Sequence, residues 1–517
     1  MKRILAPVMA GALFLSGCAA SDTNTDSTKE IARTVITTDG EVDDMNSVIR
    51  ALLYANDMDI EGIVLTSSMY HYAGNESKGV EPFRWTGTQW IYDFLDDYEA
   101  VYDNLKSHDS NYPEPDYLRS VTKIGNISNK GEMDEVTEGS EFLKELFLDN
   151  NSEPLYVQTW GGTNTTARAL KSIEAEYKDS SEWETIQQKI YDKLVLYIIL
   201  DQDESYGEYI ATNWPEIKVV NDRSNFWHFA YAWQFHSDEL NDKLKADWTY
   251  ENLVKDKGPL MENYALMGDG RILDGELAEE QRGSDAYLAN NPNYQKYDFI
   301  SEGDSPSFLY LIDNGLRSLE NPSYGGWGGR FGIASNQLYV NNVLDYDVYT
   351  NQYEAQYSLT RWFDDIQNDF AARVEWTLTP NEDEVNHAPV VTVEQGVDIS
   401  AKAGDEVVLT AHAMDLDGDD LTYKWWRYFE ADTYQDFASS KEDVEDDSLG
   451  LLLNVTRELD ENEVVDSIEI TNPESSQMSF LVPADAKAGD TIHMVIEGQD
   501  NGKHQLKHYQ RVVITVD

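Results

Sequence analysis

The sequence contains a single cysteine, Cys18, among 517 residues. No intrachain disulfide can form, so stability has to come from apolar cores and bound ions.

Basic residues are also scarce: the sequence has 39 lysines and arginines against 96 aspartates and glutamates, which gives a formal net charge of −57. This charge makes nucleic acid and anionic membrane surfaces poor partners. Because 41% of the residues are hydrophobic, the acidity does not indicate disorder, and a salty habitat explains it better than a few calcium sites.

Long apolar runs are missing after the first 17 residues, so no later segment is expected to cross a membrane. The N-terminal run, Ile4 to Leu15, follows two basic residues and is too short to span a bilayer, which indicates a signal peptide over residues 1–17. The string Leu-Ser-Gly-Cys18 resembles the lipobox of bacterial lipoproteins. The resemblance implies a lipid on Cys18, a tether over residues 18–30, and export to the outer membrane or surface of a Gram-negative cell. An ordinary signal peptide with an incidental cysteine is the alternative.

Two sequence patterns divide the mature chain. Residues 31–380 alternate short apolar runs with helical ones, which predicts an α/β domain with a mostly parallel sheet and helices on both faces. The expected strands there are 60–66, 155–159, 194–200 and 217–220, and the expected helices are 142–147, 165–173, 207–213 and 307–316. The polar residues 381–388 indicate a linker. Residues 389–517 contain only short alternating strands and predict an all-β, Ig-like sandwich.

One segment joins a buried strand to a helix through a group of acids. Val35 to Thr38 is apolar, and Met45 to Leu53 repeats apolar residues at helical spacing. Between them stand Asp39, Asp43 and Asp44, at the strand end where open α/β sheets place their ligands. Three like charges within six residues repel one another unless a cation neutralises them. Oxygen ligands alone favour calcium or magnesium.

The same segment resembles the N-terminal signature of the nucleoside hydrolase superfamily, Asp-Pro-Gly-x-Asp-Asp, with Gly40-Glu41 in place of Pro-Gly. Residues 161–170 (Gly-Gly-Thr-Asn-Thr-Thr-Ala-Arg-Ala-Leu) resemble the superfamily's later strand-to-helix turn, and residues 302–309 bring an acid into a helix. Almost the whole mature chain is similar to a lipoprotein branch described as cellulose-binding. That branch has a nucleoside-hydrolase-like domain followed by a β-sandwich, which is the fold the resemblance implies here.

The resemblance also implies a calcium site and an attacking water. It assigns Asp39 to the metal and to the base that activates water, and Asp43 to a sugar hydroxyl. The other implied calcium ligands are Asp44, the Asn164 carbonyl and Asp304. Calcium that holds a sugar diol and a water would lower the pKa of that water beside the anomeric carbon. Direct attack by the water would invert the configuration.

One position departs from the superfamily pattern. Many nucleoside hydrolases carry a histidine just before the late aspartate, where it helps the purine to leave, but this sequence has Gly303. An oxygen leaving group needs a proton donor with a raised pKa, and the candidates are Glu41, Glu302 and His71. For each of them a structural role is the alternative; for Glu41 that means a ligand or a helix N-terminal charge.

Several residues near the expected loops are candidates for contact with a sugar. Indole faces stack on sugar rings, which singles out Trp85, Trp160 and Trp327. Trp327 is preferred because four glycines flank it. Two acids that follow an expected strand, Asp201 and Asp203, could bind hydroxyls or cap the next helix.

The sandwich offers two further candidates. Trp425 and Trp426 face opposite sides of one strand, so one is expected in the core and the other on a surface suited to cellulose. The acids Asp415, Asp417 and Asp419 are expected in a turn, with a second calcium site as the alternative.

Three functional hypotheses follow. The first is a surface lipoprotein that binds a poly- or oligosaccharide and hydrolyses a glycosidic bond with calcium. The second is a non-catalytic carbohydrate-binding (cellulose-binding) protein, which Gly303 favours. The third, an N-ribosyl hydrolase acting on nucleosides, has the least support because of Gly303 and the surface anchor.

Overall fold

The computed structural model describes residues 31–434, 456–459 and 465–517. The predicted signal peptide, Cys18 and the tether lie outside the described residues. Contacts group residues 31–517 into one compact unit. In the described part of the chain, every helix is too short or too polar to cross a membrane.

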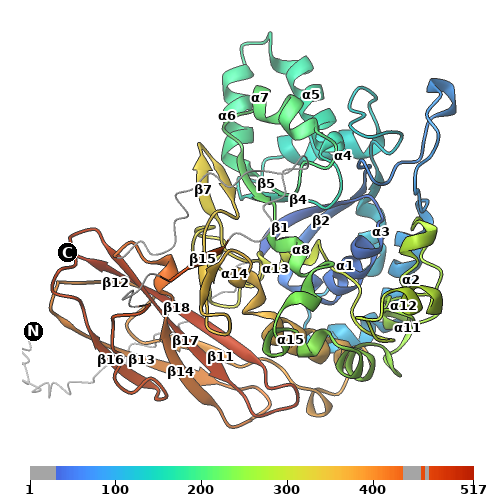
Figure 1. The fold of residues 1–517 in the computed structure, drawn as a ribbon. Coiled ribbons are helices and arrows are strands. Elements are labelled where there is room, and N and C mark those ends of the chain that lie inside the picture. Colours follow the sequence, from blue (N-terminus) through green and yellow to red (C-terminus); the bar gives the residue numbers. More distant parts are fainter. Residues whose placement is uncertain (1–30, 435–455, 460–464) are drawn as a thin grey trace, which may run out of the picture. The chain divides into compact units, whose positions relative to one another are not determined.

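An eight-stranded sheet forms the centre of the α/β region, in the order β3-β2-β1-β4-β5-β6-β8-β7 (Figure 1). Its strands are β1 (Ala32–Thr38), β2 (Met58–Leu65), β3 (Thr122–Ile124), β4 (Leu155–Thr159), β5 (Leu194–Ile199), β6 (Lys218–Asp222), β7 (Gly332–Ser335) and β8 (Leu338–Val340). All neighbours are parallel except β7 and β8. The order of the strands reverses at β1, which lies between β2 and β4. Open α/β sheets bind their ligands at such a switch point.

Helices cover both faces of the sheet. Successive residues of a buried strand point to opposite sides, so each strand contributes side chains to the apolar layers on both faces. Val35 packs in an apolar cluster that takes residues from α4 (Glu138–Leu148), α5 (Asn164–Tyr177) and α6 (Trp183–Lys193). The next residue, Ile36, packs in a cluster with residues of α1 (Val42–Leu53), α2 (Gln89–His108) and α15 (Phe363–Trp376). The predicted α/β fold with a mostly parallel sheet is confirmed.

The helix expected over residues 307–316 is shorter in the structure, where α13 spans only Ser305–Leu309. The chain turns at Gly315, which has φ +85° and lies so close to the sandwich that an added Cβ would be 1.8 Å from the Tyr509 carbonyl oxygen. The positive φ of Gly315 is not helical, so the expected helix could not continue to residue 316. The segment expected as a helix at residues 207–213 is a π-helical turn (Tyr206–Ile210) followed by α7 (Ala211–Asn213).

The C-terminal residues form the predicted sandwich. One sheet contains β11 (Val390–Val393), β13 (Glu406–Met414) and β16 (Gln477–Leu481), and the other contains β12 (Asp398–Ala401), β18 (Lys507–Val516), β17 (Thr491–Gln499) and β14 (Thr422–Arg427). Alternate residues of these strands, such as Leu409, Ile496 and Ile514, fill the core between the sheets. Asp415 accepts hydrogen bonds from the backbone N–H groups of Asp417 and Asp419, each at 3.0 Å, so these acids form the predicted turn.

The two regions are joined by more than the predicted linker. A small sheet pairs β15 (Thr456–Glu458) with β10 (Gln352–Glu354), which pairs in turn with β9 (Asp345–Asp347). The Tyr428 hydroxyl donates to Asp345 at 2.6 Å. Arg511 donates to the Leu316 carbonyl at 2.8 Å. The sandwich therefore buries polar groups against the α/β region.

This junction decides the roles of the two sandwich tryptophans. Trp425 is 2% exposed and lies in the sandwich core, as predicted for one of the pair. Trp426 packs on Trp362 of the α/β region, with ring centroids 6.2 Å apart, and under the Arg361 guanidinium. The prediction of a cellulose-binding surface residue on this strand is wrong, because the second face is covered by the neighbouring region.

Candidate carboxylate site

Four adjacent strands, β2, β1, β4 and β5, end at the edge of the sheet where the acids gather. β1 runs directly into Asp39, Gly40 and Glu41, and α1 begins at the next residue. Gly40 has φ +78°, and an added Cβ would lie 2.7 Å from Thr86 Oγ1 and 2.9 Å from Trp90 Nε1. The turn between strand and helix therefore requires glycine.

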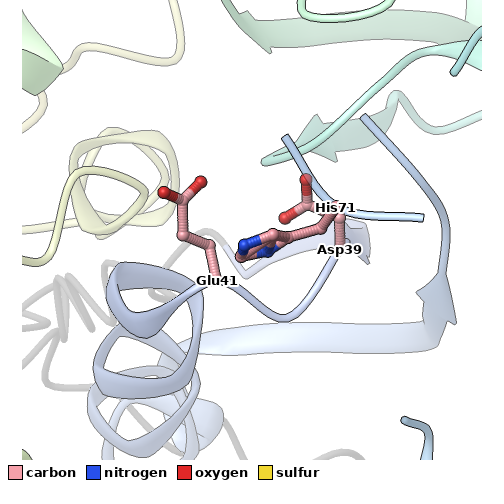
Figure 2. A group of neighbouring side chains, drawn as sticks. All are labelled: Asp39, Glu41 and His71. Atoms are coloured by element: carbon pink, nitrogen blue, oxygen red, sulfur yellow. The ribbon is translucent and has the colours of Figure 1, made fainter. Parts of the chain in front are cut away.

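Asp39, Glu41 and His71 form the first cluster, in which one ligand atom from each side chain lies within 4.8 Å of the others (Figure 2). His71 is 0% exposed, and neither ring nitrogen has a hydrogen-bond partner among the described residues. Asp39 is 2% exposed, and neither carboxylate oxygen accepts a hydrogen bond from a described residue. Burial, with a smaller effect of Arg84, lowers the pKa of His71 to about 3. The ring is neutral and its lone pair is free, so His71 is not the predicted proton donor.

A second cluster shares Glu41 with the first and adds Asp43 and Asp44, again with ligand atoms within 4.8 Å. Thr38 Oγ1 donates to Asp44 Oδ1 at 2.5 Å, and Asp39 N donates to the same oxygen at 3.2 Å. Burial, followed by the charges of Asp39 and Asp43, raises the pKa of Asp44 well above its usual range.

Asp304, immediately before α13, belongs to the same electrostatic group. Burial raises its pKa well above the usual range, and the next causes are the charges of Asp44 and Asp43. Its Oδ2 atom is buried without a hydrogen-bond partner among the described residues. The structure therefore brings Asp304 to Asp39, Asp43 and Asp44, which is the grouping that the resemblance implied.

The site holds more carboxylates than cations. Arg84 Nη2 lies 3.6 Å from Glu41, 2.9 Å from Glu276 and 3.2 Å from Glu280. Arg282 contacts Glu276 at 3.2 Å. Two guanidinium groups thus face seven carboxylates, those of Asp39, Glu41, Asp43, Asp44, Glu276, Glu280 and Asp304. The unpartnered oxygens of Asp39 and Asp304, together with the neighbouring Asp44 carboxylate, fit a divalent cation with oxygen ligands.

Five of these acids, Glu41, Asp43, Asp44, Glu280 and Asp304, line a cavity of about 420 Å³, whereas Asp39 and Glu276 do not line it. Trp160, one of the predicted contact residues, lines it and donates its indole N–H to Ser307 at 2.7 Å. Sequence reasoning missed the other lining residues that could contact a ligand, which are Tyr70, Arg84, Gln202, Phe226, Trp227, Tyr231, Glu280 and Arg282. They carry no motif, although the aromatic-rich run Phe226 to Trp233 was a signal. The half-buried Trp227 also lines a neighbouring cavity of about 350 Å³.

Glu302, one of the predicted proton donors, is fully buried behind the site. It forms a bidentate ion pair with Arg50 and accepts hydrogen bonds from the hydroxyls of Tyr264 and Ser305. It is absent from the residues that line the cavity. The prediction is wrong, because the carboxylate is already neutralised by its partner.

Trp327, the preferred sugar-stacking residue, is 3% exposed and belongs to the main apolar core. Its glycines serve close packing: an added Cβ at Gly328 would lie 2.5 Å from the Pro306 carbonyl oxygen and from Tyr310 Cβ. The prediction that Trp327 stacks on a sugar is therefore also wrong.

Trp85, another predicted contact residue, is half-buried and does not line the cavity, although its neighbour Arg84 does.

Three other predicted residues hold the loops together. The Asn164 amide donates to Ser67 Oγ at 2.9 Å and to the carbonyls of Asn126 and Glu132, and its side-chain carbonyl accepts from Thr66 at 2.6 Å. Its side chain is therefore not a calcium ligand. Asp203 accepts from the backbone N–H groups of Asn164 and Ser205. Asp201 accepts from Tyr206 N and Gly207 N at the start of a helical segment, which is the capping alternative.

Gly303 packs directly beneath the acids. An added Cβ would lie 2.8 Å from Asp43 Oδ2 and 3.2 Å from Ala230 Cβ. A histidine at this position would displace Asp43, so the departure from the superfamily pattern has a steric basis in this chain.

Comparison with known proteins agrees with this architecture. Residues 33–331 match the family described as "Cellulose-binding Sde182, nucleoside hydrolase-like domain", and residues 406–516 match "Cellulose-binding protein Sde0182, C-terminal domain". The chain belongs to this family. The match to the first family domain spans β1 to α13 and includes all the acids of the site, whereas β7 and β8 follow it.

Solved structures extend the comparison. A nucleoside hydrolase-related hypothetical protein from Saccharophagus degradans, associated with carbohydrate metabolism, is 26% identical and has a TM-score of 0.66, over 94% of this chain and 100% of that chain. A plant nucleoside hydrolase is 10% identical with a TM-score of 0.29, over 60% of this chain and 87% of that chain, which is too distant to support an argument. No match was found among curated proteins.

Proposed function

We propose that the cavity lined by Asp43, Asp44 and Asp304 binds a poly- or oligosaccharide with the help of calcium. The observation that carries this proposal is the excess of buried, unpartnered carboxylate oxygens at the base of a cavity walled by Tyr70, Trp160, Trp227 and Tyr231. Aromatic faces are suited to the apolar faces of sugar rings, and the carboxylates are suited to a cation and to hydroxyl groups. The description of the family as cellulose-binding supports the same class of ligand.

The residues suited to hold calcium are Asp39, Asp44 and Asp304. When bound, calcium would orient a sugar diol and lower the pKa of a coordinated water. Thr38 fixes the orientation of Asp44 through its 2.5 Å hydrogen bond. Asp43, whose Oδ1 has no partner among the described residues, is placed to accept a hydrogen bond from a sugar hydroxyl. Trp160 forms part of one wall of the cavity.

Glycosidic hydrolysis is the second candidate function, and the position of Asp39 favours it. Its two unpartnered oxygens can accept a proton from an attacking water, a role that binding alone does not require. The other half of the reaction needs a proton donor, and two of the three predicted residues do not fit, because Glu302 is paired with Arg50 and His71 is neutral. Burial, followed by the charges of Asp43 and Glu276, raises the pKa of Glu41 well above its usual range despite Arg84 at 3.6 Å, so Glu41 is the remaining candidate. Binding without turnover is placed first because it requires no proton donor, and nucleoside hydrolysis is placed third.

One experiment separates these functions. The mature protein is incubated with insoluble cellulose and with soluble oligosaccharides, with calcium or with chelator, and both retained protein and released reducing sugar are measured. We expect calcium-dependent retention that Asp304→Asn abolishes. Release of sugar that is lost in Asp39→Asn would establish hydrolysis, and inosine as the only substrate would establish the third function. Absence of both retention and release on every glycan would refute the carbohydrate proposal.

We also propose that the protein is an outer-membrane or surface lipoprotein attached through Cys18. The lipobox-like string Leu-Ser-Gly-Cys18 supports this. The test is membrane fractionation after metabolic labelling with a fatty acid. Cys18→Ser should lose both the label and the membrane association, whereas an unlabelled wild-type protein would contradict the proposal.

A further inference from the structure

His71 is the one side chain in the carboxylate clusters that offers nitrogen. It extends from the loop after β2, where Ser68 N donates to the His71 carbonyl at 2.9 Å and His71 N donates to Ser68 Oγ at 3.3 Å. These backbone bonds fix the loop, yet the imidazole itself makes no hydrogen bond to a described residue and is 0% exposed. A buried ring with two unpartnered nitrogens costs stability unless something binds it.

Two carboxylates lie close to the ring. A ligand atom of His71 lies within 4.8 Å of one from Asp39 and one from Glu41 (Figure 2). Two ligands on opposite sides of an ion with bonds of about 2.1 Å are about 4.2 Å apart, so small side-chain rotations would complete a site.

The kind of ligand separates this cluster from the one beside it. Glu41, Asp43 and Asp44 offer only oxygen, which suits calcium. A set of one imidazole and two carboxylates suits a borderline cation such as Mn²⁺, Fe²⁺ or Zn²⁺. Glu41 belongs to both clusters and is placed between them. The seven carboxylates around two arginines leave enough negative charge for two divalent cations.

We infer that Asp39, Glu41 and His71 form a second metal site, for a borderline divalent cation, next to the oxygen-only calcium site. Asp39, which is also suited to hold calcium, is the ligand the two sites share. His71 is the residue that selects the cation, because calcium rarely accepts nitrogen ligands. The inference concerns metal binding alone, so it does not depend on whether the protein turns over a sugar.

The test uses Mn²⁺ as the probe, since its electron spin reports nearby nitrogen directly. Metal-stripped protein is titrated with Mn²⁺ in the presence of saturating Ca²⁺, and electron spin echo modulation is recorded. We expect ¹⁴N modulation from one imidazole, which changes to the ¹⁵N pattern when the protein is labelled with ¹⁵N-histidine. This measurement needs no variant and so does not depend on whether a mutant folds.

Two variants assign the sites. His71→Leu should lose the ¹⁴N modulation and weaken Mn²⁺ binding by about 10-fold or more, while Ca²⁺ affinity stays within about 2-fold. Asp304→Asn should do the reverse. In the metal-free state His71→Leu should unfold at a temperature no lower than wild type, because the ring makes no hydrogen bond there. Mn²⁺ bound without nitrogen coupling, or simple competition of Mn²⁺ and Ca²⁺ for one site, would overturn the inference.

Discussion

Arg50 and Glu302 form a fully buried, bidentate ion pair directly behind the carboxylate site. Arg50 belongs to α1, the helix whose first turn carries Asp43 and Asp44, and Glu302 is two residues before Asp304. The pair therefore joins segments that are 252 residues apart and fixes the late aspartate relative to the early acids. We assign Glu302 to positioning Asp304 and not to chemistry.

Removal of the Glu302 charge should destabilise the whole fold. Glu302→Gln leaves the Arg50 guanidinium buried without a counter-charge, a change that costs roughly 3–5 kcal/mol. The free energy of unfolding from urea titration checks this. The matched control is Glu320→Gln, which breaks a partly exposed pair with Arg317 and should cost about 1 kcal/mol or less. Wild-type stability in Glu302→Gln, combined with loss of function, would instead return Glu302 to the chemistry.

The parts of the site that are built from residues adjacent in the chain were predicted best from the sequence. Asp39, Asp43 and Asp44 follow a strand and begin a helix, and these two elements alone decide where their side chains go. His71 and Trp160 follow the next strands in the sheet and were also placed at the correct edge. Glu302 and Trp327 were misplaced because their segments are irregular, and partners hundreds of residues away decide which way they point.

In the fold, too, elements that depend on adjacent residues were predictable from the sequence, and those that depend on distant contacts were not. The strands β2, β4, β5 and β6 were predictable from short apolar runs, and the sandwich from its alternating ones. The junction between the two regions was not predictable, because the residues that form it, such as Trp426, have the pattern of an ordinary exposed strand face. The cavity wall formed by Trp227 and Tyr231 likewise depends on how a loop without a motif is folded back over the sheet.

Trp227 should contribute to ligand binding and Trp327 to stability. Trp227 is half-buried at the wall of the cavity, so Trp227→Ala should weaken glycan binding by about 2- to 10-fold, the range expected from loss of an aromatic contact of roughly 0.5–1.5 kcal/mol. Trp327 is 3% exposed in the core, so Trp327→Ala should lower stability by roughly 3–5 kcal/mol. Calorimetric titration with a soluble oligosaccharide and thermal unfolding measure the two effects. A loss of affinity in folded Trp327→Ala that equals the loss in Trp227→Ala would contradict this division.

Gly303→Ala should disturb Asp43 specifically. The new methyl group would lie 2.8 Å from Asp43 Oδ2, so that carboxylate has to move. We expect weaker glycan binding, with a change in unfolding free energy of about 1–3 kcal/mol from overpacking. Gly418→Ala is a useful comparison for the substitution itself, because it meets no atom within 4 Å, although its φ of +83° still carries strain. Unchanged affinity in Gly303→Ala would show that Asp43 does not contact the ligand.

The junction between the regions should weaken in acid through Glu375. This side chain on α15 pairs with Lys503 and lies 3.4 Å from His504 of the sandwich. Burial alone would raise its pKa, but His504 and Lys503 outweigh burial and lower the pKa to about 2. Because the folded-state pKa is below the unfolded value, the pair stabilises the protein above about pH 4.5 and loses this effect as pH falls toward 2.

The Glu375 pair is partly open to solvent, so we expect a contribution of about 1–2 kcal/mol at neutral pH. Glu375→Gln should be less stable than wild type at pH 7, and the two proteins should converge near pH 2–3. Urea unfolding at a series of pH values gives the comparison, with the exposed Asp383→Asn as a control for loss of one negative charge. A difference that stays constant from pH 7 to pH 3 would exclude Glu375 as the titrating group.

Calorimetric titration of metal-stripped protein with Ca²⁺, with and without a soluble oligosaccharide, tests the central claim most directly. The carboxylate site predicts saturable calcium binding that Asp44→Asn and Asp304→Asn weaken by about 10-fold or more, together with glycan binding that requires calcium. Absence of calcium binding in wild type, or glycan affinity that chelator leaves unchanged, would contradict the claim.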